Sequence, residues 1–400
     1  MYLRAALAIL VMVFSVDVWS NLSPRIYNQL NDLQVQLDEA TTDAEVAEIK
    51  QELLELKQDL KGNSLGVALS LQTLAQIEVR TGDIAKAAEL ISEATQLKGL
   101  PDGTQIQLRT FLANLFYQQD QYKKTIQILS DVFAQDEKSR APSNLALMAA
   151  AYYSLEDFEN GTPYIDEANR LAKEPKQSWL QMAFAGHYQL KQYDQALVYV
   201  TRLVYLYPEN SRYWQQKAGM HQLMEDYSQA SAVKYLSYLQ GVMEKESDYL
   251  TLGRLLASQG GPYYTATMLK ESLDSGALEA SEDVLRLVYQ GFLQAKEMQK
   301  ALQELKTLYE AYPSEDDGIQ LMRLLIDQES WQQVVEFYVR FQKQEVDDDI
   351  TAEAALLAGI AQYRLGQESK AKSLFSQAAL SDKQASQAKA WLNYMAQMRQ

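Results

Sequence analysis

A pattern that recurs about every 35 residues is the strongest constraint on how this 400-residue chain can fold. In each copy a polar turn precedes an apolar or aromatic residue, followed by a small residue three positions later and apolar residues seven and ten positions later. Such spacing places these side chains on one face of a helix. The first apolar position of successive copies is occupied by Val46, Ile84, Tyr122, Phe158, Tyr193, Tyr227, Tyr263, Met298, Trp331 and, degenerately, Glu368.

A second apolar stripe precedes each turn, as in "LQTLAQIEVRTGD" and "YWQQKAGMHQLMEDY". Each period therefore predicts two antiparallel helices of ~13 residues joined by a short turn. The segment "LKQYDQALVYVTRLVYLYP", residues 190–208, has the β-branched and aromatic composition of a strand. Its register within the repeat instead predicts the second helix of a pair, which ends at Pro208.

Several copies carry the residues that mark the tetratricopeptide repeat, a helix–turn–helix unit. In one copy Trp214, Ala218, Asp226, Tyr227 and Ala230 stand at the matching places. The chain resembles this family over roughly residues 64–380. The resemblance implies an all-α fold, a right-handed superhelical solenoid of about nine to ten antiparallel helix pairs. One pair cannot bury its apolar faces alone, so the core would form where neighbouring pairs stack.

The first 20 residues, "MYLRAALAILVMVFSVDVWS", differ from the rest of the chain because one arginine is followed by a short apolar run. This run is too short for a membrane span and is typical of a cleaved export signal, here with cleavage after Ser20. We therefore expect a protein of the periplasm of a Gram-negative bacterium. The alternative is an uncleaved signal that anchors the protein to the inner membrane.

Both ends of the repeat array need a cap. Residues 21–63 are expected to form an N-terminal helical hairpin, with Ser23 as N-cap and Pro24 at the first helical position. Residues 64–380 would form the solenoid. Residues 381–400 are expected to form a closing helix whose aromatic residues, Trp391 and Tyr394, cover the last repeat.

The composition argues against several classes of function. The 53 acidic and 37 basic residues give a formal charge of −16, which disfavours nucleic acid as a partner. The absence of cysteine excludes disulfides, thiolate metal sites and cysteine nucleophiles. The chain also has no phosphate-binding or nucleophile-elbow motif. We expect no catalytic, cofactor-binding or metal-binding residues.

The two histidines, His187 and His221, occupy equivalent places in consecutive copies. A metal held between them would lack a third ligand, so we expect both to be packed and hydrogen-bonded. Two acidic clusters, "SEDDG" (residues 314–318) and "EVDDDI" (residues 345–350), lack the ligand spacing of a calcium loop. Both are interpreted as solvated helix starts, where carboxylates meet the positive end of the helix dipole favourably.

Tetratricopeptide arrays generally hold partner proteins, and the resemblance implies that the first helix of each pair lines a concave groove. Tyrosine offers flat contact area and a hydroxyl, while glutamine and asparagine amides can bind a peptide backbone. The residues expected in the partner-binding groove are Asn114, Tyr117, Tyr153, Gln181, Tyr188 and Gln215. Later equivalents of the tyrosine position are Gln222, Ser258, Leu293, Ile326 and Tyr363. The alternative is that the tyrosine rings pack between adjacent helices.

The N-terminal run "LSPRIYNQLNDLQVQLDEA" is similar to the start of tetratricopeptide repeat proteins associated with the TonB system of Gram-negative bacteria. This resemblance implies a partner in the TonB–ExbB–ExbD complex and a role in iron uptake. The leading hypothesis is thus a non-enzymatic periplasmic scaffold that binds a protein partner; the oligomeric state is left open. The alternatives are a cell-envelope assembly or secretion factor and an all-helical polysaccharide hydrolase, which would need two carboxylates ~5–10 Å apart.

Overall fold

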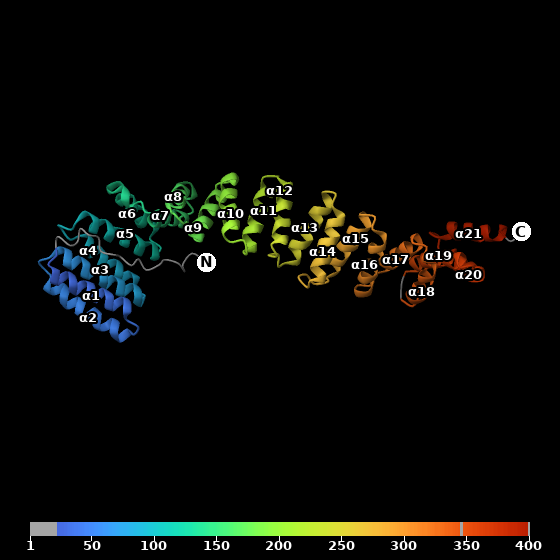
Figure 1. Cartoon of the computed structure of the whole chain (residues 1–400), viewed down its shortest axis with the longest axis horizontal. Helices are drawn as coiled ribbons and strands as arrows, with labels where there is room; N and C mark the ends of the chain where they lie inside the picture. The colour runs from blue at the N-terminus through green and yellow to red at the C-terminus, as the bar shows by residue number, and fades with distance from the viewer. Residues whose placement is uncertain (1–21, 345–346, 399–400) are drawn as a thin grey trace. The chain divides into compact units, whose positions relative to one another are not determined.

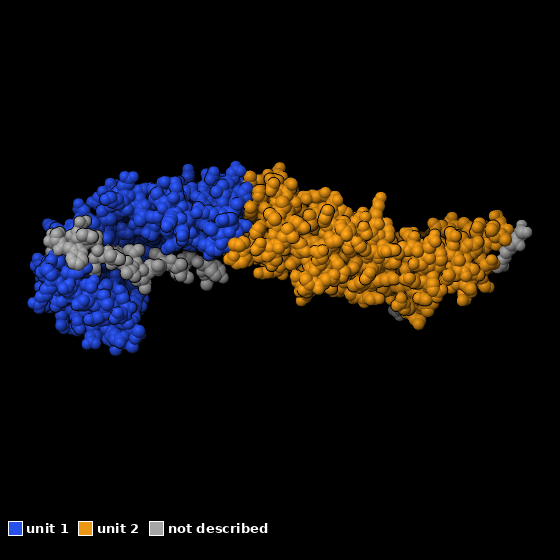
Figure 2. Space-filling model, in the orientation of Figure 1, with its two compact units in different colours: residues 1–207 blue, residues 208–400 orange. Residues whose placement is uncertain are grey.

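The structure of the protein is a computed structural model that describes residues 22–344 and 347–398. The chain forms two compact units, unit 1 up to Tyr207 and unit 2 from Pro208 (Figure 2). Over the described residues both units contain helices and no strand (Figure 1). The predicted export signal, residues 1–20, lies outside this part of the chain.

Unit 1 consists of helix pairs that follow one another in chain order, each closed by a short turn. The pairs are α1 (Pro24–Glu39) with α2 (Asp43–Asp59), α3 (Ser64–Thr81) with α4 (Ile84–Thr95), α5 (Asp102–Gln118) with α6 (Tyr122–Gln135), α7 (Pro142–Ser154) with α8 (Phe158–Leu171), and α9 (Gln177–Gln189) with α10 (Tyr193–Leu206). A short 3-10 helix, η2 (Glu137–Ser139), links α6 to α7. The segment with strand-like composition is helical as α10 and ends before Pro208, as its register predicted.

Unit 2 repeats the same arrangement and ends in a single helix. Its pairs are α11 (Ser211–Leu223) with α12 (Tyr227–Leu239), α13 (Glu246–Ser258) with α14 (Pro262–Asp274), α15 (Glu282–Gln294) with α16 (Met298–Ala311), α17 (Glu315–Asp327) with α18 (Trp331–Phe341), and α19 (Asp348–Arg364) with α20 (Glu368–Ala378); α21 (Ala385–Gln397) follows. The predicted all-α fold of stacked antiparallel helix pairs is confirmed. The predicted domain boundaries stay predictions.

The two helices of a pair occupy different layers of each unit. First helices of successive pairs contact each other directly, as α5 contacts α7 and α13 contacts α15. Second helices pack against the first helices on either side, as α4 does with α3 and α5. We call the surface formed by α11, α13, α15, α17 and α19 the first-helix face of unit 2, and the surface formed by α1, α3, α5, α7 and α9 that of unit 1.

In every pair from α3/α4 to α19/α20, two backbone hydrogen bonds close the turn between the helices. In the turn before α12, the Glu225 N–H donates to the carbonyl oxygen of Gln222 at 3.0 Å, and the Asp226 N–H donates to that of His221 at 2.8 Å. This is a Schellman turn, whose central residue takes the left-handed conformation. The residues in that place are Gly82, Asp120, Glu156, Lys191, Glu225, Gly260, Lys296, Glu329 and Gly366, all with positive φ.

The repeat frame is displaced in two copies. Thr42 caps α2 and forms a capping box with Glu45, so Val46 lies one turn inside that helix instead of at its start. Pro262 is the first residue of α14, where a proline is favourable, and the predicted Tyr263 is its second residue.

The end caps match the sequence expectations. The Ser23 side chain accepts from the Ile26 N–H at 3.4 Å, with Pro24 at the first helical position. Trp391 of α21 stacks on Phe375 of the preceding helix, with ring centroids 5.5 Å apart. The ring centroids of Tyr394 and Tyr363 lie 6.0 Å apart. No helix within the described residues is both long and apolar enough to span a membrane.

Candidate functional site

An open cavity of about 480 Å³ lies on the first-helix face of unit 2, between α15, α17 and α19. Its volume falls in the range of ligand pockets, about 300–1,000 Å³. Apolar side chains from all three helices line it: Leu293, Ile319 and Ile350. Leu293 is one of the positions that the repeat frame assigned to the groove. The amides of Gln290 and Gln320 also line the cavity and can pair with a peptide backbone.

One wall of the cavity is held by an ion pair between the partly exposed Arg286 of α15 and the buried Asp317 of α17. The two terminal nitrogens of Arg286 each donate to one carboxylate oxygen of Asp317, both at 2.9 Å. The Ser314 hydroxyl donates to Asp317 at 2.6 Å, and Arg286 also bonds Glu282 at 2.9 Å. Burial alone would raise the pKa of Asp317, but the hydrogen bonds from Arg286 and Ser314 outweigh it and lower that pKa.

This pair corrects the interpretation of "SEDDG" as a solvated helix start. Ser314 does cap α17, but Asp317 is only 5% exposed and is fully engaged by Arg286 and Ser314. The interpretation holds for Asp316, which is exposed. In the other acidic cluster, Asp347 caps α19, and Asp349 forms an ion pair with Lys383 at 2.6 Å.

Of the other charged residues in the cavity, Arg323 and Glu353 pair with each other and Asp316 has no partner in the described chain. Arg323 of α17 donates to Oε1 of Glu353 of α19. Oε2 of Glu353 has no hydrogen-bond partner within the described residues, and Asp316 has neither a hydrogen bond nor an ion pair there. The cavity thus presents one carboxylate without an ion-pair partner in the described chain, that of Asp316, and one carboxylate oxygen of Glu353 that accepts no hydrogen bond there.

Of the groove residues predicted in unit 1, Tyr153 packs within the array. Its hydroxyl lies 2.8 Å from Thr162 Oγ1 on α8, and its ring centroid lies 4.9 Å from that of Phe158. Gly161 and Gly186 leave room for the ring. Burial raises the pKa of the Tyr153 hydroxyl to about 12. This packing is what the alternative interpretation expects of the ring, and partner binding by Tyr153 stays a prediction.

The other predicted residues of unit 1 lie on its first helices with differing exposure. Tyr188 is 43% exposed, with Phe184 and Tyr193 beside its ring, and Gln181 is exposed on the same helix. Tyr117 is half-buried against Tyr122, with ring centroids 5.4 Å apart. The carbonyl oxygen of the Asn114 side chain accepts from Gln118 at 2.7 Å. Partner binding by these residues stays a prediction.

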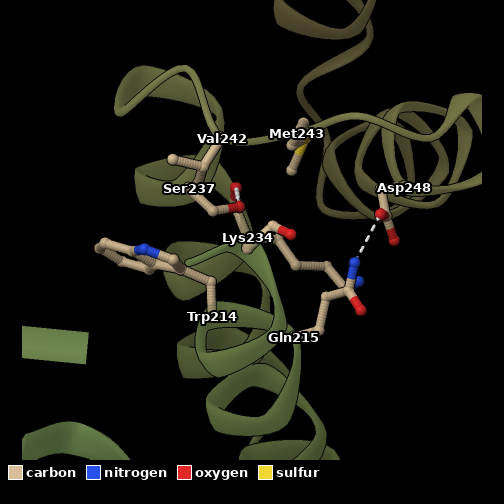
Figure 3. Close-up of a pocket in the computed structure, with 8 residues that line it drawn as sticks. Trp214, Gln215, Lys234, Ser237, Val242, Met243 and Asp248 are labelled. Atoms are coloured by element: carbon tan, nitrogen blue, oxygen red, sulfur yellow. Dashed lines mark hydrogen bonds between the residues drawn. The ribbon is translucent and has the colours of Figure 1, made fainter. Parts of the chain in front are cut away.

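Gln215, the predicted groove residue of unit 2, ties two first helices together. Its amide donates to Asp248 of α13 at 2.9 Å (Figure 3). Beside this bond lies a pocket of about 10 Å³, enough for about one water molecule, that is also lined by Trp214 and Met243. This hydrogen bond links α11 to α13, and partner binding by Gln215 stays a prediction.

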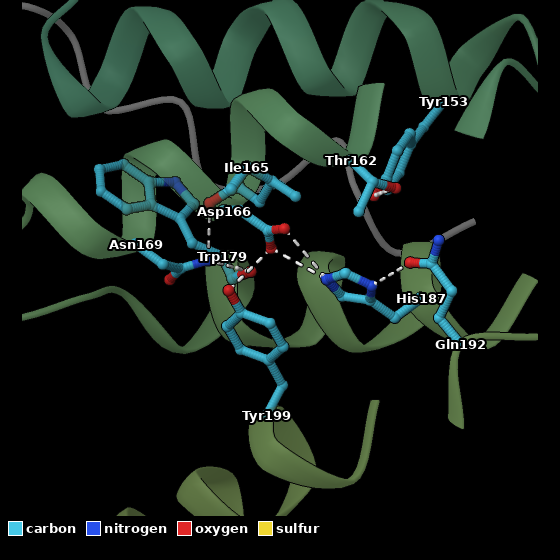
Figure 4. Close-up of polar contacts among 9 residues, drawn as sticks. All are labelled: Tyr153, Thr162, Ile165, Asp166, Asn169, Trp179, His187, Gln192 and Tyr199. Atoms are coloured by element: carbon cyan, nitrogen blue, oxygen red, sulfur yellow. Dashed lines mark hydrogen bonds and ion pairs between the residues drawn. The ribbon is translucent and has the colours of Figure 1, made fainter. Parts of the chain in front are cut away.

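His187 is buried at the centre of a partly exposed polar cluster in unit 1 (Figure 4). Its Nε2 lies 3.1 Å from both carboxylate oxygens of Asp166, and its Nδ1 lies 2.7 Å from Oε1 of Gln192. The Tyr199 hydroxyl donates to Asp166 at 2.7 Å, and the Tyr199 ring stacks on the imidazole. These contacts join α8, α9 and α10, and the expectation of a packed, hydrogen-bonded histidine is confirmed for His187.

We expect this cluster to make the stability of α8–α10 depend on pH. Burial lowers the pKa of His187, but its hydrogen bonds to Asp166 and Gln192 and the charge of Asp166 outweigh burial and raise it. A raised pKa means that the stabilisation is complete below the unfolded value of about 6.5 and is lost as the pH rises through the folded pKa. Amide hydrogen exchange of α8–α10 should therefore show weaker protection at pH ~8 than at pH ~6 after correction for the intrinsic rate. The change should be absent in His187→Gln; an unchanged pH dependence in that variant would contradict the prediction.

His221 is packed but less well satisfied. Its Nδ1 is buried without a hydrogen-bond partner within the described residues, and the nearest carboxylate oxygen, on Asp226, lies 3.7 Å away. His221 is therefore packed as expected, but its Nδ1 lacks the expected hydrogen bond among these residues. No group of three or more His, Cys, Asp or Glu side chains suited to a metal occurs in the described part of the chain.

Several cavity residues were missed by the sequence reasoning, although a signal for them existed. Extending the groove positions to every copy places Gln290, Ile319 and Arg323 on first helices near Leu293, whereas Glu353 has no equivalent among those positions. Tyrosine recurs at the groove position in three successive copies of unit 1, so the groove was predicted there. Nothing in the sequence shows which copies leave space between their side chains.

No family model matches this chain, and no curated protein matches it in sequence. Among solved structures, a tetratricopeptide repeat protein from Parabacteroides merdae aligns at 14% identity over 67% of this chain and 99% of its own, with a TM-score of 0.40. MamA aligns at 10% identity over 42% of this chain and 94% of its own, with a TM-score of 0.36. YrrB, a tetratricopeptide repeat protein with an unusual peptide-binding site, aligns at 14% identity over 48% and 97%, with a TM-score of 0.35. The likeness concerns the helical-repeat fold.

Proposed function

We propose that the protein is a non-enzymatic scaffold that holds another polypeptide against the first-helix faces of its helix pairs. The observation that carries this proposal is the open cavity between α15, α17 and α19. Its apolar walls can bury a side chain, and the amides of Gln290 and Gln320 can bond the backbone of an extended segment. In unit 1 the exposed Tyr188 and Gln181 offer the same kinds of group.

For the setting of this scaffold we propose the bacterial periplasm, with a partner in the TonB–ExbB–ExbD complex. The signal-like first 20 residues support export, and the resemblance of the N-terminal run to TonB-associated proteins supports the partner. Cell fractionation and mass spectrometry of the mature N-terminus test export, with cleavage expected after Ser20. A full-length cytosolic protein would overturn this part of the proposal.

Site-specific photocrosslinking in the native cell tests the scaffold itself. A benzophenone amino acid replaces Gln290 or Tyr188 on a first helix, or Gln303 on the second helix α16 as the matched exposed control. We expect a polypeptide to crosslink from the two first-helix positions and not from Gln303. TonB, ExbB or ExbD as the crosslinked protein supports the TonB assignment; outer-membrane assembly or secretion components support the alternative. A lack of crosslinks from both first-helix positions would overturn the scaffold proposal.

A further inference from the structure

We infer that the cavity between α15, α17 and α19 binds a lysine or arginine side chain of the partner polypeptide. This inference rests on the proposed scaffold function and names the chemistry that the scaffold recognises. It combines two features of the cavity, the unpaired carboxylate of Asp316 beside the open oxygen of Glu353, and the apolar walls.

The charges of the cavity favour a cation. Asp317 is already neutralised by Arg286, and Arg323 occupies only Oε1 of Glu353. The free carboxylate of Asp316 and Oε2 of Glu353 remain, on α17 and α19 respectively. An incoming guanidinium or ammonium group can donate to the carboxylate of Asp316, which has no cationic partner in the described chain, since carboxylates form their strongest hydrogen bonds with charged donors.

The apolar walls of the cavity favour a basic side chain over a hydrated inorganic cation. Leu293, Ile319 and Ile350 present apolar surface from three helices. The methylene stem of lysine or arginine packs well on such surface while its charged head reaches polar groups. A hydrated inorganic cation would leave these walls without a partner. An extended polypeptide with a basic side chain therefore complements both the walls and the carboxylates.

The test uses the whole protein and two labelled peptides, one of alternating alanine and arginine and one with citrulline in place of arginine. Citrulline keeps the shape of arginine and removes its charge. Fluorescence anisotropy at physiological ionic strength, where long-range attraction is screened, measures both affinities. We expect the arginine peptide to bind at least about tenfold more tightly than the citrulline peptide. Equal affinities would overturn the inference.

Variants separate the cavity from the general acidity of the protein. Asp316→Asn removes the unpaired carboxylate, leaves the pair of Arg323 with Glu353 intact, and should weaken arginine-peptide binding by about tenfold. Asp327→Asn makes the same change of net charge at an exposed position outside the cavity and should leave binding within about twofold. Asp316→Lys, whose replaced side chain makes no hydrogen bond or ion pair in the described chain, should weaken binding at least as much as Asp316→Asn. Equal losses in the cavity and control variants would overturn the inference.

The two proposals fail in different experiments. If crosslinks form from Gln290 while the cavity variants bind the arginine peptide normally, the scaffold stands and the basic-side-chain site is wrong. If the peptide binds as expected while no cellular polypeptide crosslinks from the first-helix faces, the cation site stands and the scaffold function is wrong.

Discussion

Replacing Gly186 by alanine should destabilise unit 1 by about 2–4 kcal/mol, although alanine is the better helix former. A Cβ at this position would overlap the Tyr153 hydroxyl and lie 2.5 Å from Thr162 Oγ1. Relief of this overlap would break the 2.8 Å hydrogen bond between Tyr153 and Thr162 and move the ring from its place beside Gly161. Helix arrays of this kind need not unfold in one step, so amide hydrogen exchange in α7–α9 is the appropriate measurement.

Gly219 provides the control because it lies inside α11, and a Cβ added there would meet no atom within 4 Å. Gly219→Ala should stabilise its helix by up to about 1 kcal/mol, the ordinary helix preference of alanine over glycine. The double variant Gly186→Ala/Tyr153→Ala should lose less stability than the sum of the two single variants, because the overlap requires both groups. Additive losses, or a stabilising Gly186→Ala, would show that Tyr153 is not confined as described.

Removal of the Asp317 carboxylate should have the second-largest effect. Asp317→Ala leaves the Arg286 guanidinium without its bidentate partner and removes the acceptor of the Ser314 hydroxyl. Loss of one member of a buried ion pair usually costs about 3–5 kcal/mol. Here Arg286 keeps Glu282 and is partly exposed, so we expect about 2–3 kcal/mol in the opening of α15 and α17.

The adjacent residue offers a matched control. Asp316 lies in the same helical turn and has the same charge, but it is exposed, and its side chain makes no hydrogen bond or ion pair within the described chain. Asp316→Ala should cost less than about 1 kcal/mol, the usual limit for a surface charge at a helix start. Hydrogen exchange of α17 compares the two variants directly. Similar losses in both would mean that the acidic helix start, and not the pair with Arg286, stabilises this region.

Much of the fold could be predicted from the sequence because helix and turn lengths are set locally. The frame correctly assigned α10 as a helix despite its valines and tyrosines. It placed Tyr263 at the start of α14, whereas Gly260 takes the turn position and Pro262 is the first residue of the helix. These features depend on residues within a few positions, so the sequence carries them.

The site depends on residues that are distant in sequence. Tyr153 and Tyr188 occupy the same place in consecutive copies, yet Tyr153 is packed and Tyr188 is 43% exposed. Gly161 makes room for the ring of Tyr153, whereas the copy of Tyr188 has Ala196 at the corresponding place. Asp317 is likewise buried through Arg286, 31 residues earlier. Neither environment follows from the repeat pattern of one copy.

The turns within the helix pairs affect how the number of pairs in such an array can change during evolution. Six of the nine central turn residues have a side chain in the left-handed conformation, which costs about 1–2 kcal/mol each. Since the same two backbone hydrogen bonds close every turn, its shape does not depend on the residues that occupy it. A segment that runs from one such turn to the next begins and ends with the same backbone geometry. Gain or loss of that segment by unequal recombination would rejoin the chain without distorting either turn, so the number of pairs can vary in evolution while each pair is preserved.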